Sequence, residues 1–315
     1  MTESANADTW RDVYESICAG GNVGLLHDWV THNVAVDTPQ GRIYGRDDFI
    51  AAIAREREGL RVRGSRCRSF VGKMGSLPAV VSTLECDVDH VSTSPIFGPA
   101  TDRAGTLTSV FVGTWHEGRV FRAWRVADCG ALALSLGLDP AALARGLTVN
   151  SPGRGGIPWA FGEVRAAHGQ LAPPATPAPL PGLPAGPAHA IATLQAAWNL
   201  RRPDLVLDAY AGDARDGAIR GDHPWRRVLT ACSDGVLFVE HCVAGEGGDP
   251  DECLAVAWRW VGTHDGAGFG EPTGHRLHFR GMSVMTVRQT RITSECIVCD
   301  ALGTYCDIAL RSRPM

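Results

Sequence analysis

The sequence predicts an α+β fold that occurs twice, in two tandem domains. The chain has 315 residues, about twice the length of a typical single domain. Each half begins with apolar residues at helical spacing and continues with the period-two alternation of antiparallel strands. Helices followed by strands are typical of α+β domains. The closing segments of the two halves also align with each other without a gap.

This internal alignment has an offset of 172 positions, the distance from Phe97 to Phe269. In the window that begins at these two residues, eight of 32 positions are identical. Average residue frequencies supply roughly two identities by chance. The window ends on Asp128 in the first half and on Asp300 in the second half. A repeat of this length indicates that one domain was duplicated.

The elements of the first half follow from residue spacing. Trp10, Tyr14 and Ile17 lie three and four positions apart, which predicts a helix. Two further helices precede a run of alternating residues that ends in a hairpin. The predicted elements are helices over 10–17, 22–29 and 47–58, and strands over 79–90, 107–115 and 119–128.

The second half repeats this order. Pro203 followed by Asp204 favours the start of a helix, and Gly221 marks a turn. The predicted elements are helices over 191–198 and 203–210, and strands over 253–264, 277–287 and 291–300. Between the halves Pro, Gly and Ala dominate, as in flexible linkers. We therefore expect domain 1 over 1–145, a linker over 146–187 and domain 2 over 188–315.

Composition and charge exclude several classes of protein. The net charge is −4 and no basic block with interleaved aromatic residues occurs, so we expect no nucleic-acid partner. No apolar run reaches membrane-spanning length, and residues 1–10 lack the pattern of a secretory signal. We expect a cytoplasmic protein without a membrane partner, whose ten cysteines are reduced.

Several short runs resemble the motifs of one family. In the second half, Gly262–Gly266, Gly270–Gly274 and His278–Met282 resemble the run GTH-x-G, G-x-PTG and F-x-G. In the first half, Gly118–Asp128 and Leu134–Gly137 resemble the closing run GKI-x-E-x-W-x-x-x-D and QLG. These are motifs of the SnoaL-like polyketide cyclases and ester cyclases of the nuclear transport factor 2-like superfamily. The resemblance covers most of both halves.

The resemblance implies that each domain is a cone, with helices packed on a curved antiparallel sheet around a hydrophobic pocket. It implies a cofactor-independent cyclase of a polyketide-like carbonyl substrate in secondary metabolism, such as antibiotic biosynthesis. It also implies pairing through sheet faces, as an internal pseudo-dimer or a homodimer. The same superfamily includes isomerases, epoxide hydrolases and binding modules. An isomerase, an epoxide hydrolase and a non-catalytic small-molecule binding protein are therefore the alternatives.

The two halves depart from the family pattern at different positions. The usual acidic residue two positions before the tryptophan is Arg122 in the first half and Ser294 in the second half. Cys296 replaces the tryptophan itself in the second half, whereas the first half keeps Trp124. We therefore expect the first half to be better equipped for catalysis.

Asp128 and Asp300 are the predicted catalytic residues. Arg122, Trp124 and Asp128 share strand parity and project from one face of the sheet, which the resemblance implies to be the pocket face. Burial raises the pKa of a carboxyl group, and such a group can move a proton from a carbon beside a carbonyl. The alternative is that each aspartate ends a strand and caps the following turn.

The predicted substrate-binding residues are mainly aromatic, because aromatic side chains supply large and rigid contact areas. A strand tryptophan can instead belong to the core, and a strand-end histidine can instead lie on the surface. The predicted binding residues are Trp124, Arg122, His264, Trp258, Trp260 and Tyr14.

No cofactor or metal is expected, because the sequence has no nucleotide-binding loop, dinucleotide fingerprint or paired metal motif. Cys296 and Cys299 have CxxC spacing, but they lie on a predicted strand without a second pair. Glu85, Asp87 and Asp89 alternate on one strand, either as a carboxylate cluster for epoxide opening or as a solvated face.

Overall fold

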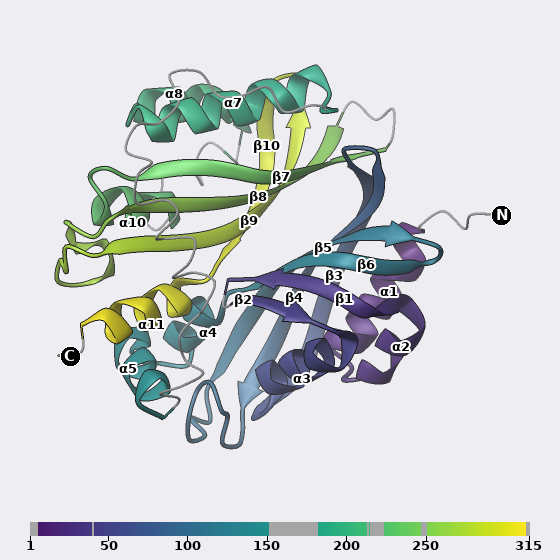
Figure 1. Cartoon of the computed structure of the whole chain (residues 1–315), viewed down its shortest axis with the longest axis vertical. Helices are drawn as coiled ribbons and strands as arrows, with labels where there is room; N and C mark the ends of the chain where they lie inside the picture. Colours follow the sequence, from purple (N-terminus) through teal and green to yellow (C-terminus); the bar gives the residue numbers. More distant parts are fainter. Residues whose placement is uncertain are drawn as a thin grey trace. The chain divides into compact units, whose positions relative to one another are not determined.

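The computed structural model describes residues 6–39, 41–150, 182–212, 214, 224–246 and 251–312. Residue contacts divide the chain into two compact units. Unit 1 consists of Met1–Val71, Leu77–Trp159 and Asp300–Met315, and unit 2 consists of Gly72–Ser76 and Ala160–Cys299. Both units combine helices with β-structure, so the α+β class is confirmed (Figure 1).

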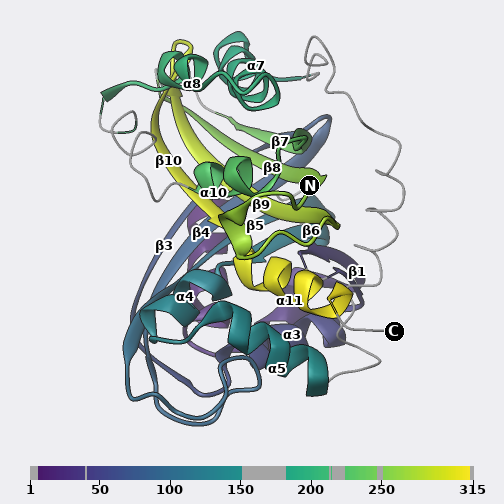
Figure 2. The same ribbon diagram turned by 90° about the vertical axis from the view of Figure 1, so that its left-hand side faces the viewer.

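Most of the expected linker over 146–187 lies outside the described residues. Its ends are helical, because α5 (Pro140–Asn150) and α7 (Ala185–Asn199) extend into it. The C-terminal helix α11 (Ala301–Arg311) belongs to unit 1, where it packs beside α4 (Cys129–Ser135) and α5 (Figures 1 and 2). The expected domain boundaries stay a prediction.

The helices of unit 1 that precede its sheet follow the sequence pattern, whereas α4, α5 and α11 were not predicted. Helix α1 (Ala7–Cys18) begins at Asn6, whose side chain accepts hydrogen bonds from two backbone N–H groups, as an N-cap residue does. The helix expected over 22–29 is divided into η1 (Val23–Leu25) and α2 (Leu26–Trp29). Helix α3 (Arg46–Arg57) agrees with the prediction within one residue.

The sheet of unit 1 has the strand order β3-β4-β5-β6-β1-β2. Its strands are β1 (Val30–Thr38), β2 (Gly41–Tyr44), β3 (Leu60–Met74), β4 (Leu77–His90), β5 (Ala104–His116) and β6 (Arg119–Ala127). The expectation of a purely antiparallel sheet is wrong for this unit, because β1 runs parallel to β6. No hairpin joins these two strands, and a long connection allows a parallel pair.

Unit 2 contains an antiparallel sheet in the order β7-β8-β9-β10. Its strands are β7 (Val236–Gly245), β8 (Asp251–Thr263), β9 (Arg276–Arg288) and β10 (Arg291–Cys299). Helix α7 lies against β7, β9 and β10 (Figure 2). The remaining elements are α8 (Pro203–Ala209), α10 (Pro224–Ala231) and η2 (Ala267–Phe269).

The last hairpins of the two units have the same register. Val112 pairs with Trp124 in unit 1, and Val284 pairs with Cys296 in unit 2, at the offset of 172 positions found in the sequence. Both hairpins also shift register at the equivalent place. In unit 1 the shift lies between residues 114 and 115, and in unit 2 it lies between residues 286 and 287. Two copies of a duplicated domain are expected to share strand register in this way.

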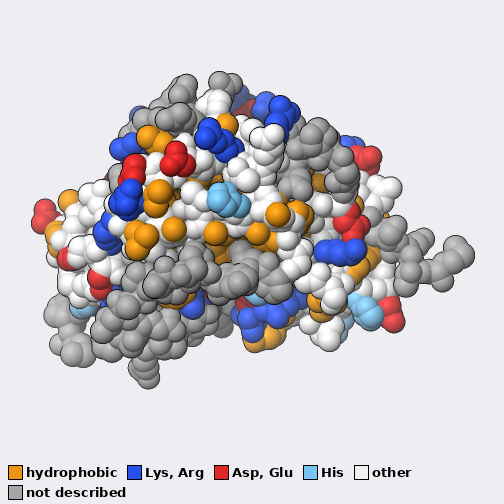
Figure 3. Space-filling view, turned by 90° about the horizontal axis from the view of Figure 1, so that it is seen from above, with side chains coloured by type: hydrophobic (Ala, Val, Ile, Leu, Met, Phe, Trp, Pro, Cys, Tyr) orange, Lys and Arg blue, Asp and Glu red, His pale blue; other side chains and the backbone are white. Residues whose placement is uncertain are grey.

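The described part of the chain has no helix that is both long and apolar enough to cross a membrane. On the face shown in Figure 3, basic and acidic side chains are interspersed. This distribution agrees with the small net charge of −4.

Candidate functional site

One face of the unit 1 sheet is covered by α1 and α3. Phe111 of β5 packs against three aromatic rings of these helices, with centroid distances of 5.4 Å to Trp10, 5.1 Å to Tyr14 and 6.4 Å to Phe49. Phe111 pairs with Arg125 of β6. Paired residues of adjacent antiparallel strands project from the same face. Arg125 therefore lies on the covered face.

Arg125 is the centre of a buried polar cluster. Its side chain is 6% exposed, and its Nη1 donates a hydrogen bond of 2.6 Å to Oε1 of Glu56. Its Nε donates to the hydroxyl of Tyr14 at 3.3 Å. We call Tyr14, Glu56 and Arg125 the buried cluster. It joins α1, α3 and β6.

The sequence of α3 explains why a glutamate points inward. The buried residues Phe49 and Ile53 are followed by Glu56 at the spacing i, i+4, i+7, which forms one helix face. Glu56 therefore continues the buried stripe. Its Oε1 accepts from Arg125, whereas its Oε2 is buried and has no hydrogen-bond partner among the described residues. A buried acceptor without a donor is unfavourable, so this oxygen is the unsatisfied atom of the cluster.

Burial shapes the electrostatics of the buried cluster. Burial raises the pKa of Tyr14 well above its usual value, although Arg125 and a hydrogen bond from Ser109 oppose this shift. Burial disfavours the charged form of Arg125, but the negative charge of Glu56 and the hydrogen bond to it act in the opposite direction, and the pKa of Arg125 is raised. At neutral pH, Tyr14 is therefore a neutral hydroxyl and Arg125 is a cation.

The two predicted catalytic aspartates cap helices. The Oδ1 of Asp128 accepts from the backbone N–H of Ala131 in α4 at 2.8 Å. The Oδ1 of Asp300 accepts from the backbone N–H of Gly303 in α11 at 2.9 Å. This is the capping alternative that the sequence left open. A catalytic role of either aspartate stays a prediction.

The structure places Arg122 and Trp124 on the other face of the sheet. Trp124 pairs with Val112, so its side chain lies on the face opposite to Phe111 and Arg125. There the guanidinium carbon of Arg122 lies 4.8 Å from the Trp124 ring centroid, and its Nη2 lies 3.5 Å from Oδ2 of Asp37. Neither residue contributes to the helix-covered face.

The predicted binding residues of unit 2 are buried. The Trp258 ring centroid lies 4.4 Å from that of Trp225, and Trp260 is 1% exposed. His264 is fully buried, and its Nδ1 lies 3.1 Å from Oγ1 of Thr273. Burial lowers the pKa of His264. These contacts give each of the three residues a packing role.

Two of the three alternating carboxylates of β4 pair with arginines of β3, and the third, Asp87, accepts a hydrogen bond from Thr106 at 2.9 Å. Asp89 accepts from Arg61 at 2.7 Å and from Arg63 at 3.0 Å, and Glu85 accepts from Arg66 at 3.1 Å. The arginine side chains are at least half exposed. Glu85 and Asp89 thus belong to ion pairs on a solvated face.

The CxxC pair lies on β10 and forms no disulfide, as all ten cysteines are free thiols. Among the described residues, no three His, Cys, Asp or Glu side chains are grouped so that they could hold a metal ion.

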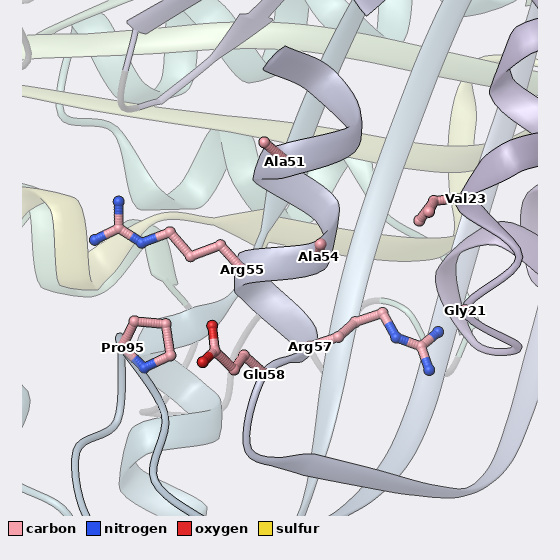
Figure 4. Close-up of a pocket in the computed structure, with 8 residues that line it drawn as sticks. All are labelled: Gly21, Val23, Ala51, Ala54, Arg55, Arg57, Glu58 and Pro95. Atoms are coloured by element: carbon pink, nitrogen blue, oxygen red, sulfur yellow. The ribbon is translucent and has the colours of Figure 1, made fainter. Parts of the chain in front are cut away.

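Unit 1 also has an open groove of about 730 Å³ beside the C-terminal half of α3. Its other walls come from the loop after α1 and from the connection between β4 and β5 (Figure 4). The groove is lined by Gly21, Val23, Ala51, Ala54, Arg55, Arg57, Glu58 and Pro95.

No family model matches this chain, and no curated protein matches it. Parts of the chain are similar to solved structures. One is a candidate polyketide cyclase from Pseudomonas putida, with 15% identity, a TM-score of 0.34, and coverage of 39% of this chain and 92% of the other. Another is IdmH, a candidate polyketide cyclase from Streptomyces antibioticus, with 17% identity, a TM-score of 0.30, and coverage of 42% of this chain and 97% of the other. A third is a candidate SnoaL-like polyketide cyclase from Mesorhizobium loti, with 16% identity, a TM-score of 0.29, and coverage of 38% of this chain and 95% of the other. At these identities and TM-scores we derive neither a family nor a reaction from the likeness.

Of the predicted site residues, only Tyr14 belongs to the buried cluster. Glu56 and Arg125 were missed. A signal was present for both, since each is a charged residue within an otherwise apolar pattern, Glu56 on the inner face of α3 and Arg125 between Trp124 and Val126. A charge at such a position is rarely buried unless it is paired.

Proposed function

We propose that unit 1 is the catalytic part of a cofactor-independent enzyme that cyclises or isomerises a polyketide-like carbonyl compound by proton transfer. The observation that carries the proposal is the buried cluster. It combines a cation, a neutral hydroxyl and a carboxylate oxygen that has no hydrogen-bond partner in the described part of the chain, on the helix-covered face of the sheet.

Each member of the buried cluster has a role in this chemistry. Oε2 of Glu56 takes a proton from a carbon next to a carbonyl group, and Arg125 and Tyr14 donate hydrogen bonds to the oxygen on which negative charge develops. The carbanion attacks a second carbonyl of the same molecule and forms a carbon–carbon bond. The resulting alkoxide takes the proton back from Glu56. The step therefore needs no oxidant, reductant or external co-reactant.

A non-catalytic binding protein is the second candidate. It is favoured by the packing roles of Trp258, Trp260 and His264, and by the capping roles of Asp128 and Asp300. In that case the predicted site residues stabilise the fold, and the buried cluster holds a ligand without changing it.

The two candidates are distinguished with heptane-2,6-dione and longer linear polyketones, whose cyclisation is followed by ultraviolet absorbance and mass spectrometry. Glu56→Gln should lower the rate by about 10² to 10⁴, the usual contribution of a general acid or base. Asp48→Asn, on an exposed position of the same helix, is the matched control. Binding of a polyketone without turnover would favour the binding protein. Loss of turnover in Asp128→Asn, with Glu56→Gln fully active, would return the catalytic role to Asp128.

A further inference from the structure

We propose that the groove beside α3 is a second binding site, for a small amphipathic monocarboxylate. It goes beyond the proposed reaction, which uses the buried cluster. A groove of about 730 Å³ has the size of a site for a small organic molecule, roughly 300 to 1,000 Å³. Its lining has a charged part and an apolar part (Figure 4).

Arg57 supplies the anchor for the carboxylate. Its Nη1 donates to the backbone carbonyl of Cys18 at 2.5 Å and to that of Ile17 at 3.5 Å, at the C-terminal end of α1. These contacts hold the guanidinium in place. Among the described residues, neither Nε nor Nη2 of Arg57 has a hydrogen-bond acceptor. This edge of a guanidinium matches the two oxygens of a carboxylate.

Gly21 lets the guanidinium lie against the backbone. A Cβ at this position would be 3.2 Å from Nη2 of Arg57, tighter than an ordinary contact, and the φ of +82° disfavours any other residue. Figure 4 shows the Arg57 side chain extending from α3 toward Gly21. The absence of a side chain at Gly21 thus leaves room for the guanidinium beside the loop.

The charges of the lining favour a monoanion. Arg55 and Arg57 contribute two positive charges, and Glu58 contributes one negative charge, so the groove is net positive by one. A cation is repelled by the two arginines, and the second charge of a dianion is repelled by Glu58. A carboxylate with a single charge matches this balance.

The apolar part of the lining consists of small side chains. Ala51 and Ala54 are exposed on α3, and Val23 and Pro95 lie on the flanking segments. A hydrocarbon chain placed there removes apolar surface from water, which contributes roughly 25 cal/mol per Å². An amphipathic acid therefore fits better than acetate or formate does.

Arg55 and Arg57 also have a structural role, which the experiment has to distinguish from ligand binding. Both lie in the last turn of α3, where positive charge interacts favourably with the helix dipole. If this is their only role, the groove has no affinity for a carboxylate.

Octanoate is the probe, with 1-octanol and octylammonium as the uncharged and cationic controls, titrated into the full chain by calorimetry and NMR. Octanoate should bind saturably, and at least tenfold more tightly than either control. Ala54→Leu fills the groove and should weaken octanoate binding by at least tenfold. Ala131→Leu, at an exposed position of α4, is the matched control and should leave it unchanged.

Arg57→Gln should weaken octanoate at least tenfold and Arg57→Lys less, because lysine keeps the charge but loses the two-point contact. If Arg57→Gln does not fold, octanoate binding to Ala54→Leu still tests the proposal. Octanoate that does not bind, or that binds equally well to Ala54→Leu, would overturn the proposal. Affinity that changes in Glu56→Gln but not in Ala54→Leu would also overturn it, because the ligand would then occupy the buried cluster.

Discussion

The ion pair between Glu56 and Arg125 should show strong energetic coupling. Removing one partner of a buried pair leaves an uncompensated charge, which costs about 3 to 5 kcal/mol. Arg125 is 6% exposed and Glu56 is 20% exposed, so water partly compensates a lone Glu56. We expect Arg125→Leu to cost about 3 kcal/mol, near the lower end of this range. The double variant Glu56→Leu/Arg125→Leu should cost less than either single variant, because no unpaired charge remains.

The assay is urea unfolding followed by tryptophan fluorescence, together with hydrogen exchange of the amides of α1 and α3. Both are needed, because two compact units need not unfold in a single transition. The matched control is Arg202→Leu, which removes an exposed ion pair with Asp204 and should leave the midpoint unchanged. If the cost of the double variant equals the sum of the two single costs, the pair is not coupled and the reasoning is refuted.

Three further predictions follow from the contacts of single residues. Asp128→Ala should lower the free energy of unfolding by about 1 kcal/mol through loss of the N-cap, whereas Asp128→Asn keeps the cap. If thermal unfolding shows that both variants lose the same stability, the capping role is contradicted. Because burial lowers the folded-state pKa of His264, the unfolded chain takes up a proton first as the pH falls below about 6.5, so unit 2 should lose stability there and be fully stable above it. His264→Gln should flatten this pH profile, and an unchanged profile would count against the assignment. Gly281→Ala should destabilise unit 2 by about 1 to 3 kcal/mol in urea unfolding, since its Cβ would lie 2.2 Å from the Trp258 ring, while Gly24→Ala, in open space, should not.

Much of the fold was predictable from local pattern. The apolar spacing of Trp10, Tyr14 and Ile17 predicted α1, and the same residues are buried in the structure. The gapless alignment of the two halves predicted equivalent hairpins, which share register and bulge position. Strand β3 was missed, because its alternating arginines leave few apolar residues to mark a strand.

The candidate site was less predictable. Val112 and Trp124 are as deeply buried as Phe111 and Arg125, although the two pairs project from opposite faces of the same hairpin. Where both faces are buried, alternation identifies two faces but does not tell which one the helices cover. The prediction therefore chose the face of Trp124, and the buried cluster lies on the other.

The sequence by itself determined the α+β order and the paired hairpins, because these depend on residues close together in the chain. Only the tertiary structure decided that Glu56 meets Arg125, 69 positions further along the chain, and that α11 packs beside α4 and α5. Such contacts depend on packing between distant segments. Local periodicity carries information about which side chains share a face, but not about which segment covers that face.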